Sequence, residues 1–166
     1  MQRKGHVLVV AYPLQGHAAP LLKLSRRIAE HGIQVTFAIA EQERERMLTA
    51  MPDFEEANQL IKLVSVPDGS KSGYDRKVGR NLAESFHAMI PSYLDGLLSK
   101  DCTGITGVIF DPALSCFVGI PKKMGLKTAV SWTSTPGCLA LGLKIQKLLE
   151  DRVIDENGKY RCFSPI

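Results

Sequence analysis

The first 40 residues place a helical pattern between two apolar runs. Residues 6–11 (HVLVVA) are typical of a strand buried on both faces. Apolar positions then recur every three to four residues, which predicts a helix from about Ala18, with Pro20 tolerated in its first turn. Gly32 is suited to end this helix, and residues 34–40 (QVTFAIA) form the second predicted strand. The segment therefore predicts a β-α-β unit.

The same alternation continues along the chain. Further strands are predicted at residues 61–66, 107–110 and 127–132, and further helices at 78–99, 113–124 and 137–149. Surface loops are expected at residues 51–58 and 67–77. Because a β-α-β crossover is right-handed and joins parallel strands, the pattern predicts an α/β fold with a doubly wound, Rossmann-like parallel sheet.

The length of the chain limits its domain organisation. With 166 residues and 45% hydrophobic content, it suits one domain with an ordinary core. Residues 1–150 are predicted to form this Rossmann-like domain. Residues 151–166 have no apolar periodicity and are predicted to be an irregular tail, so the chain is expected to be interrupted rather than finished.

Charge and cysteines argue against several classes of function. The net charge is +4, but basic pairs such as Arg26-Arg27 are scattered and accompany no nucleic-acid-binding motif. The four cysteines are widely spaced, which disfavours zinc and a disulfide framework. Cys116 and Cys138 are expected to be small core residues. This cysteine usage indicates a reducing compartment, so a cytoplasmic location is expected.

A targeting segment is also disfavoured. Arg3 and Lys4 precede an apolar run, as in a signal peptide, but the run is short and Pro13 interrupts its continuation. A buried strand explains it better. No apolar stretch is long enough to span a membrane.

Two polar residues follow predicted strands at the edge where ligands bind in open α/β sheets. His17 lies in the turn after the first strand, and Asp111 comes directly after residues 107–110. A histidine held by a carboxylate is a general-base arrangement, because the carboxylate fixes the tautomer and stabilises the imidazolium. No nucleophile is evident beside them, so the activated group would be a substrate hydroxyl.

Other interpretations of these residues stay open. His17 can simply line the turn, and Asp111-Pro112 is typical of an N-cap followed by a proline at the first helical position. One aspartate can perform both roles. Residues 13–17 (PLQGH) do not match a dinucleotide-binding or Walker A motif, so Glu41 after the second strand is a poor candidate for a ribose ligand.

At this point a family resemblance becomes specific. Residues 6–22 closely resemble the opening of plant UDP-glycosyltransferases, a hydrophobic strand followed by P-x-Q-G-H-x-x-P-x-L. Supporting similarities follow in the same order at residues 31–37 (HGIQVTF), 65–69 (SVPDG), Asp111, 131–133 (SWT) and 144–155 (KIQKLLEDRVID). The resemblance covers nearly the whole chain.

The resemblance implies the N-terminal, acceptor-binding half of a two-domain GT-B fold. His17 would be the general base for a hydroxyl of a small hydrophobic acceptor, and Asp111 would orient it. The sugar, in this family often glucose, would pass from a UDP-sugar co-substrate with inversion, without metal or other cofactor. Gln15 would lie near the acceptor and Thr133 near the donor.

The chain also departs from the family pattern. The C-terminal donor-binding motifs W-A-P-Q and H-C-G-W-N-S do not occur, so a truncated enzyme is expected. Cys116 stands where the family often has tryptophan, and Pro121 is expected to kink or shorten its helix. Two alternatives remain open. One is a non-catalytic small-molecule-binding remnant, and the other is a flavodoxin-like binding domain. An exposed inter-domain face is expected to promote self-association.

Overall fold

The computed structural model describes residues 5–67, 79–100 and 104–159, with side chains left out at 79–85 and 99–100. The chain divides into two compact units, Met1–Thr133 and Ser134–Ile166, which are described separately. Residues 68–77 of the predicted loop at 67–77 lie outside the described ranges, as do Cys102, Cys162 and residues 160–166 of the predicted tail. The predicted extent of one domain over residues 1–150 stays a prediction.

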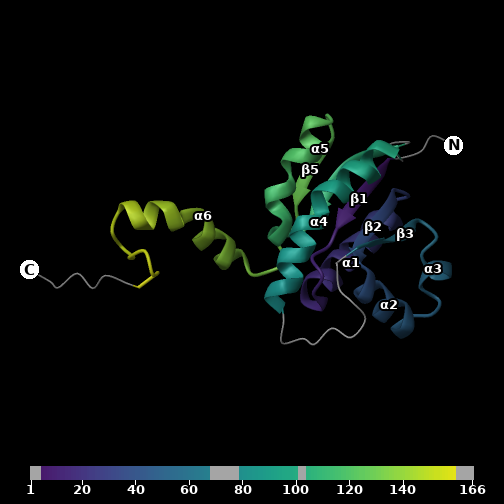
Figure 1. Cartoon of the computed structure of the whole chain (residues 1–166), viewed down its shortest axis with the longest axis horizontal. Helices are drawn as coiled ribbons and strands as arrows, with labels where there is room; N and C mark the ends of the chain where they lie inside the picture. The colour runs from purple at the N-terminus through teal and green to yellow at the C-terminus, as the bar shows by residue number, and fades with distance from the viewer. Residues whose placement is uncertain (1–4, 68–78, 101–103, 160–166) are drawn as a thin grey trace, which may run out of the picture. The chain divides into compact units, whose positions relative to one another are not determined.

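The first unit is built on a sheet of five parallel strands (Figure 1). The strands run in the order β3-β2-β1-β4-β5. Their bounds are β1 His6–Val10, β2 Gln34–Ala40, β3 Ile61–Val66, β4 Ile105–Phe110 and β5 Lys127–Val130. The order reverses direction between β1 and β4, where Val10 pairs with Phe110. This arrangement confirms the predicted doubly wound α/β fold, and it makes the edge after β1 and β4 the topological switch point.

The connecting helices cover both faces of this sheet. Their bounds are α1 Gln15–Glu30, α2 Glu41–Ala50, α3 Phe54–Ala57, α4 Gly79–Lys100, η2 Pro112–Phe117 and α5 Gly119–Lys123. Successive strand residues point to opposite faces, so β1 contributes Leu8 and Val10 to one core and Val9 to the other. The first core packs against α4 and η2, and the second against α1 and α3.

Helix α1 begins earlier than predicted. Its first residue is Gln15, so His17 lies in the first helical turn rather than in the turn before it. The backbone N–H groups of His17 and Ala18 both donate to the carbonyl of Leu14, at 2.9 Å. Pro20 therefore lies inside the helix, beyond its first turn. Local hydrogen bonding to Leu14 starts the helix upstream of the proline, where apolar periodicity gives no signal.

Three other predictions are corrected. The sequence does not predict helix α2, because EQERERMLTA has little apolar periodicity. The loop expected at 51–58 contains the short helix α3, whose Phe54 is buried. The helix expected at 113–124 is divided into η2 and α5, with Pro121 in the short second piece, which confirms the expected shortening. Cys116 and Cys138 are exposed rather than core residues. The apolar sequence around them did not ensure burial.

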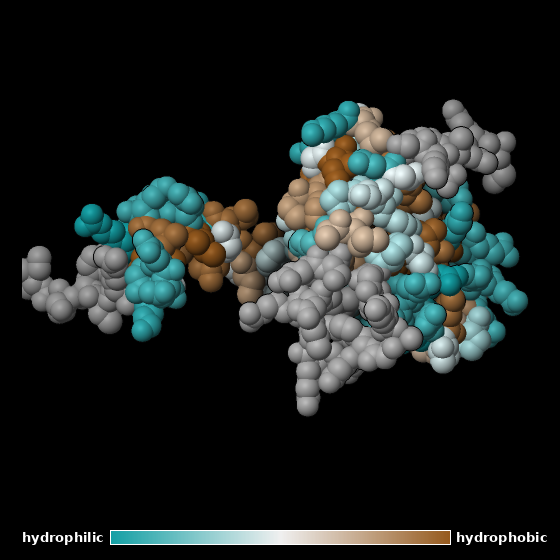
Figure 2. Space-filling model, viewed as in Figure 1, coloured by the Kyte–Doolittle hydropathy of each residue, from teal (hydrophilic) through white to brown (hydrophobic). Residues whose placement is uncertain are grey.

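The second unit contains α6, Pro136–Glu150, close to the predicted helix. The Thr135 hydroxyl caps it by accepting from the backbone N–H of Cys138, at 3.4 Å. None of its residues is buried, and its apolar side chains gather on the surface (Figure 2). Helices that expose so much apolar surface are typical interaction elements.

Candidate active site

His17 is presented by the start of α1 at the switch point of the sheet. Strand β1 ends at Val10, and the chain turns through Tyr12 and buried Pro13 into the helix. His17 is the third helical residue, and 36% of its side chain is exposed. The imidazole is therefore fixed by a regular element while part of it remains open to a ligand.

Asp111 is held at the end of the neighbouring strand. Its backbone N–H donates to the carbonyl of Val10 at 3.0 Å, which ties the end of β4 to the end of β1. Its side chain is completely buried and accepts from the backbone N–H of Ala113 at 2.9 Å. This is the N-cap of η2, with Pro112 at the first helical position. The capping interpretation is confirmed.

The structure also joins Asp111 to His17. Nδ1 of His17 lies 3.0 Å from each carboxylate oxygen of Asp111, across 94 positions of sequence. An ionised carboxylate only accepts hydrogen bonds, so Nδ1 carries the proton and donates it. In the neutral ring the lone pair then lies on Nε2. Asp111 thus performs both roles, and the pair has the geometry of an oriented general base.

A group of aromatic rings adjoins this pair. The Tyr12 ring lies 5.2 Å from the His17 ring, centre to centre, and 6.3 Å from the rings of Phe86 and His87 on α4. The His87 ring lies 5.3 Å from that of Phe117 in η2. Sequence reasoning missed this group, because its members come from three separate segments. Only the position of Tyr12 directly after a strand could have drawn attention to it.

Among the described residues, no hydrogen bond or ion pair joins Gln15 or Thr133 to His17 or Asp111. Gln15 is the exposed first residue of α1 and lines a groove toward α2. Thr133 is half-buried and follows β5, where the backbone N–H of Ser131 donates to the carbonyl of Phe110 at 2.9 Å. That bond puts the segment before Thr133 beside the end of β4. The roles expected for Gln15 and Thr133 stay predictions.

The described residues hold neither a metal-binding cluster nor a membrane-spanning helix. No cluster of three or more His, Cys, Asp or Glu side chains suited to a metal ion occurs within residues 5–67, 79–100 and 104–159. In the same ranges, no helix is both long and apolar enough to cross a membrane.

Comparison with known proteins identifies the family of the chain. No protein-family model matches the chain. UDP-glycosyltransferase 83A1 of Arabidopsis thaliana is 31% identical over 166 residues, covering 94% of this chain and 36% of the relative. The crystal structure of LpCGTa with UDP has a TM-score of 0.73 at 21% identity, covering 96% of this chain and 37% of that one.

A second solved structure has a similar fold over nearly the same part of the chain. TcCGT1 in complex with UDP has a TM-score of 0.71 at 25% identity, covering 92% of this chain and 33% of that one. Sequence and fold together define the N-terminal part of a GT-B glycosyltransferase. The chain belongs to the plant UDP-glycosyltransferase family, and it spans about a third of the length of the curated relatives it matches.

Proposed function

We propose that this chain supplies the acceptor-binding side and the general base of an inverting UDP-glycosyltransferase. The observation that carries the proposal is the hydrogen bond from His17 Nδ1 to both oxygens of buried Asp111, at 3.0 Å. The acceptor is a small hydrophobic molecule with a hydroxyl group. The donor is a UDP-sugar, for which we propose UDP-glucose.

The proposed reaction is a single displacement at the anomeric carbon. As the acceptor oxygen forms its bond to that carbon, its proton moves to Nε2 of His17. The bond from the anomeric carbon to the phosphate oxygen breaks, and UDP leaves with the electron pair. Asp111 stabilises the imidazolium that forms, so full deprotonation of the hydroxyl before attack is not needed.

The remaining site assignments follow the family resemblance. Gln15 contacts the acceptor, and Thr133 lies near the donor sugar and its phosphates. As the family resemblance implies, the proposed transfer uses no metal ion or other cofactor. The proposed transfer takes place in the cytoplasm, as part of plant secondary metabolism.

A transfer assay tests the proposal. The chain is assayed alone and joined to the C-terminal part of UDP-glycosyltransferase 83A1, with UDP-glucose and a panel of phenols and alcohols. We expect the joined protein to add one hexose to at least one acceptor, as read by mass spectrometry, with or without EDTA. Acceptor binding without transfer by a folded, UDP-binding chimera would instead support the alternative function, a non-catalytic binding module.

We further propose that the chain self-associates through α6. The helix exposes large apolar side chains, and their exposed fractions reach 57% at Leu141 and 75% at Leu143. Apolar surface of this kind is stabilised when it is covered by another molecule. A second copy of the chain offers the same helix.

A further inference from the structure

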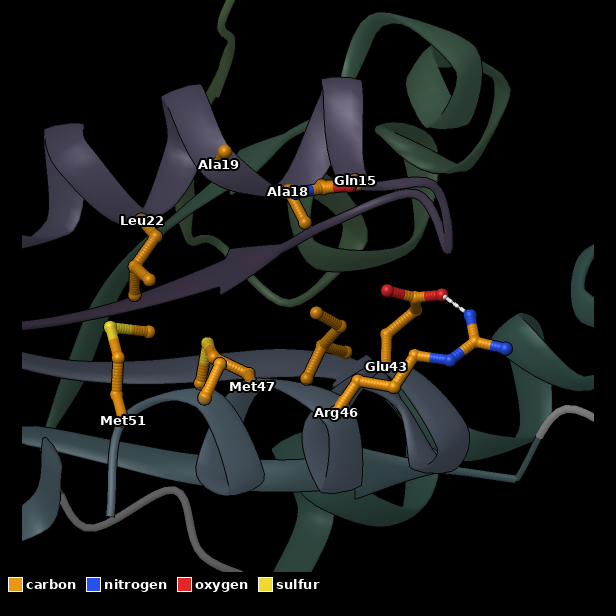
Figure 3. A pocket seen from close by; sticks show the side chains of 10 residues that line it. Gln15, Ala18, Ala19, Leu22, Glu43, Arg46, Met47 and Met51 are labelled. Carbon is orange, nitrogen blue, oxygen red and sulfur yellow. Dashed lines mark hydrogen bonds and ion pairs between the residues drawn. The ribbon is translucent and has the colours of Figure 1, made fainter.

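A groove separates α1 from α2 on the face of the sheet that these helices cover. Its volume is about 330 Å³, and Figure 3 shows side chains of α1 and α2 facing each other across it. Its lining includes Gln15 from the start of α1 but not His17. The groove therefore reaches Gln15, which is proposed to contact the acceptor, but neither His17 nor Asp111 lines it.

The body of the groove is apolar. Ala18 and Leu22 of α1 and Ile39 of β2 line it and are almost completely buried, with exposed fractions of 8%, 9% and 2%. Met47 and Met51 face them from the α2 side (Figure 3). Methionine side chains are flexible and polarisable and make favourable contacts with aromatic rings, so this wall can adapt to a flat ring.

One end of the groove is polar. Glu43 of α2 pairs there with Arg46, and Gln15 of α1 lines the same groove (Figure 3). The Glu43 side chain is 18% exposed, whereas that of Arg46 is 50% exposed. Arg46 neutralises the charge of the carboxylate, and a carboxylate can accept more than one hydrogen bond. The end of the groove thus suits an uncharged hydrogen-bond donor.

We propose that this groove is a second binding site, for a small aromatic alcohol whose rings contact Met47 and Met51 and whose hydroxyl donates to Glu43. The volume is at the lower limit of small-molecule pockets, which favours a two-ring ligand over a larger one. An apolar body with few polar groups at one end is the usual composition of such sites. The site does not depend on the function proposed for His17.

Methionine methyl NMR tests the proposal on the whole chain. The five methionines include Met47 and Met51 in the groove, whereas Met89 on α4 and Met124 after α5 are exposed elsewhere. The chain, labelled at its methionine methyl groups, is titrated with 2-naphthol. We expect saturable shifts at Met47 and Met51 only, and about tenfold weaker binding of 2-methoxynaphthalene, which cannot donate a hydrogen bond.

Variants locate the binding. Ala19→Phe places a ring in the groove from an exposed position and should abolish the shifts, whereas Ala88→Phe, at an exposed position of α4, should leave them unchanged. Circular dichroism checks that both variants fold. His17→Ala should also bind 2-naphthol normally, which separates this site from the proposed catalytic one.

Three results would overturn the proposal. The first is the absence of any shift up to the solubility of 2-naphthol. The second is a shift of equal size at all four described methionines. The third is a shift of Met47 and Met51 on raising the protein concentration alone, because it would assign the groove to a second copy of the chain.

Discussion

Nδ1 of His17 lies 3.0 Å from both carboxylate oxygens of Asp111, and the same aspartate accepts from the backbone N–H of Ala113 at 2.9 Å. One buried side chain thus orients the histidine and caps η2. The two functions are separable, because the cap requires only an acceptor oxygen, whereas an oriented, stabilised imidazolium requires the negative charge.

Substitution of Asp111 should therefore distinguish the stability that comes from the cap of η2 from that which comes from the negative charge. Asp111→Asn keeps an oxygen for Ala113, but Asp111→Ala removes the cap and leaves His17 without its partner. We expect Asp111→Ala to lower the free energy of unfolding by about 1 to 3 kcal/mol, and Asp111→Asn by less. Urea unfolding measures both, with exposed Asp95→Ala as the control. Equal losses for the two variants would argue against the cap.

Two glycines should respond in opposite ways to the same substitution. Gly96 lies inside α4, and an added Cβ would meet nothing within 4 Å, so Gly96→Ala should stabilise the chain by about 0.5 to 1 kcal/mol. Gly125 has φ +76°, a left-handed conformation that alanine rarely adopts. Gly125→Ala should therefore destabilise the chain. Thermal unfolding should show a higher Tm for Gly96→Ala and a lower Tm for Gly125→Ala than for the unmodified chain. If both Tm values moved in the same direction, these backbone assignments would be contradicted.

Alkaline pH should destabilise the chain through Tyr93. Burial against the α4 side of the sheet raises the pKa of Tyr93 above its ordinary value of 10.0. The unfolded chain then releases the phenol proton at a lower pH than the native chain. The contribution of neutral, buried Tyr93 to the free energy of unfolding is therefore fully present below pH 10 and is lost as the pH rises through the native pKa. Tyr93→Phe should flatten the decline in stability above pH 10. An unchanged decline in urea titrations across this range would refute the assignment.

Self-association predicts a dependence on concentration. Light scattering should show species larger than a monomer as the protein concentration rises. Replacement of Leu141 and Leu143 by lysine should restore the monomer, because charges on α6 oppose its burial. Leu60→Lys changes an exposed leucine of the first unit and should have no effect. A monodisperse monomer of the unmodified chain at high concentration would exclude this role of α6.

Much of the fold could be predicted from the sequence, since a buried parallel sheet leaves strong patterns. The runs at Gln34–Ala40 and Ile61–Val66 match their strands because helices cover both faces of the sheet, so that most positions of these strands are at least partly buried. The early start of α1 and the helix at Glu41–Ala50 could not be predicted, because hydrogen bonds near Leu14 and packing of Met47 decide them rather than apolar periodicity.

In the candidate site, too, some features could be predicted from the sequence and others could not. His17 and Asp111 could be predicted, because both lie after strands that topology places side by side. The rings of Tyr12, His87 and Phe117 could not, because their proximity depends on how α4 and η2 pack. The role expected for Gln15 beside the acceptor stays a prediction. Its place in the lining of the groove between α1 and α2 could not be predicted, because that depends on how the two helices pack.

The most direct test of the central claim is the turnover of the chimera described above with and without the His17 imidazole. His17→Ala should lower kcat by about 10²- to 10⁴-fold, the usual contribution of a general base, while UDP still binds. His31→Ala, an exposed histidine after α1, should keep full turnover. A His17→Ala chimera that transfers the sugar at nearly the unmodified rate would contradict the assignment of His17 as the base.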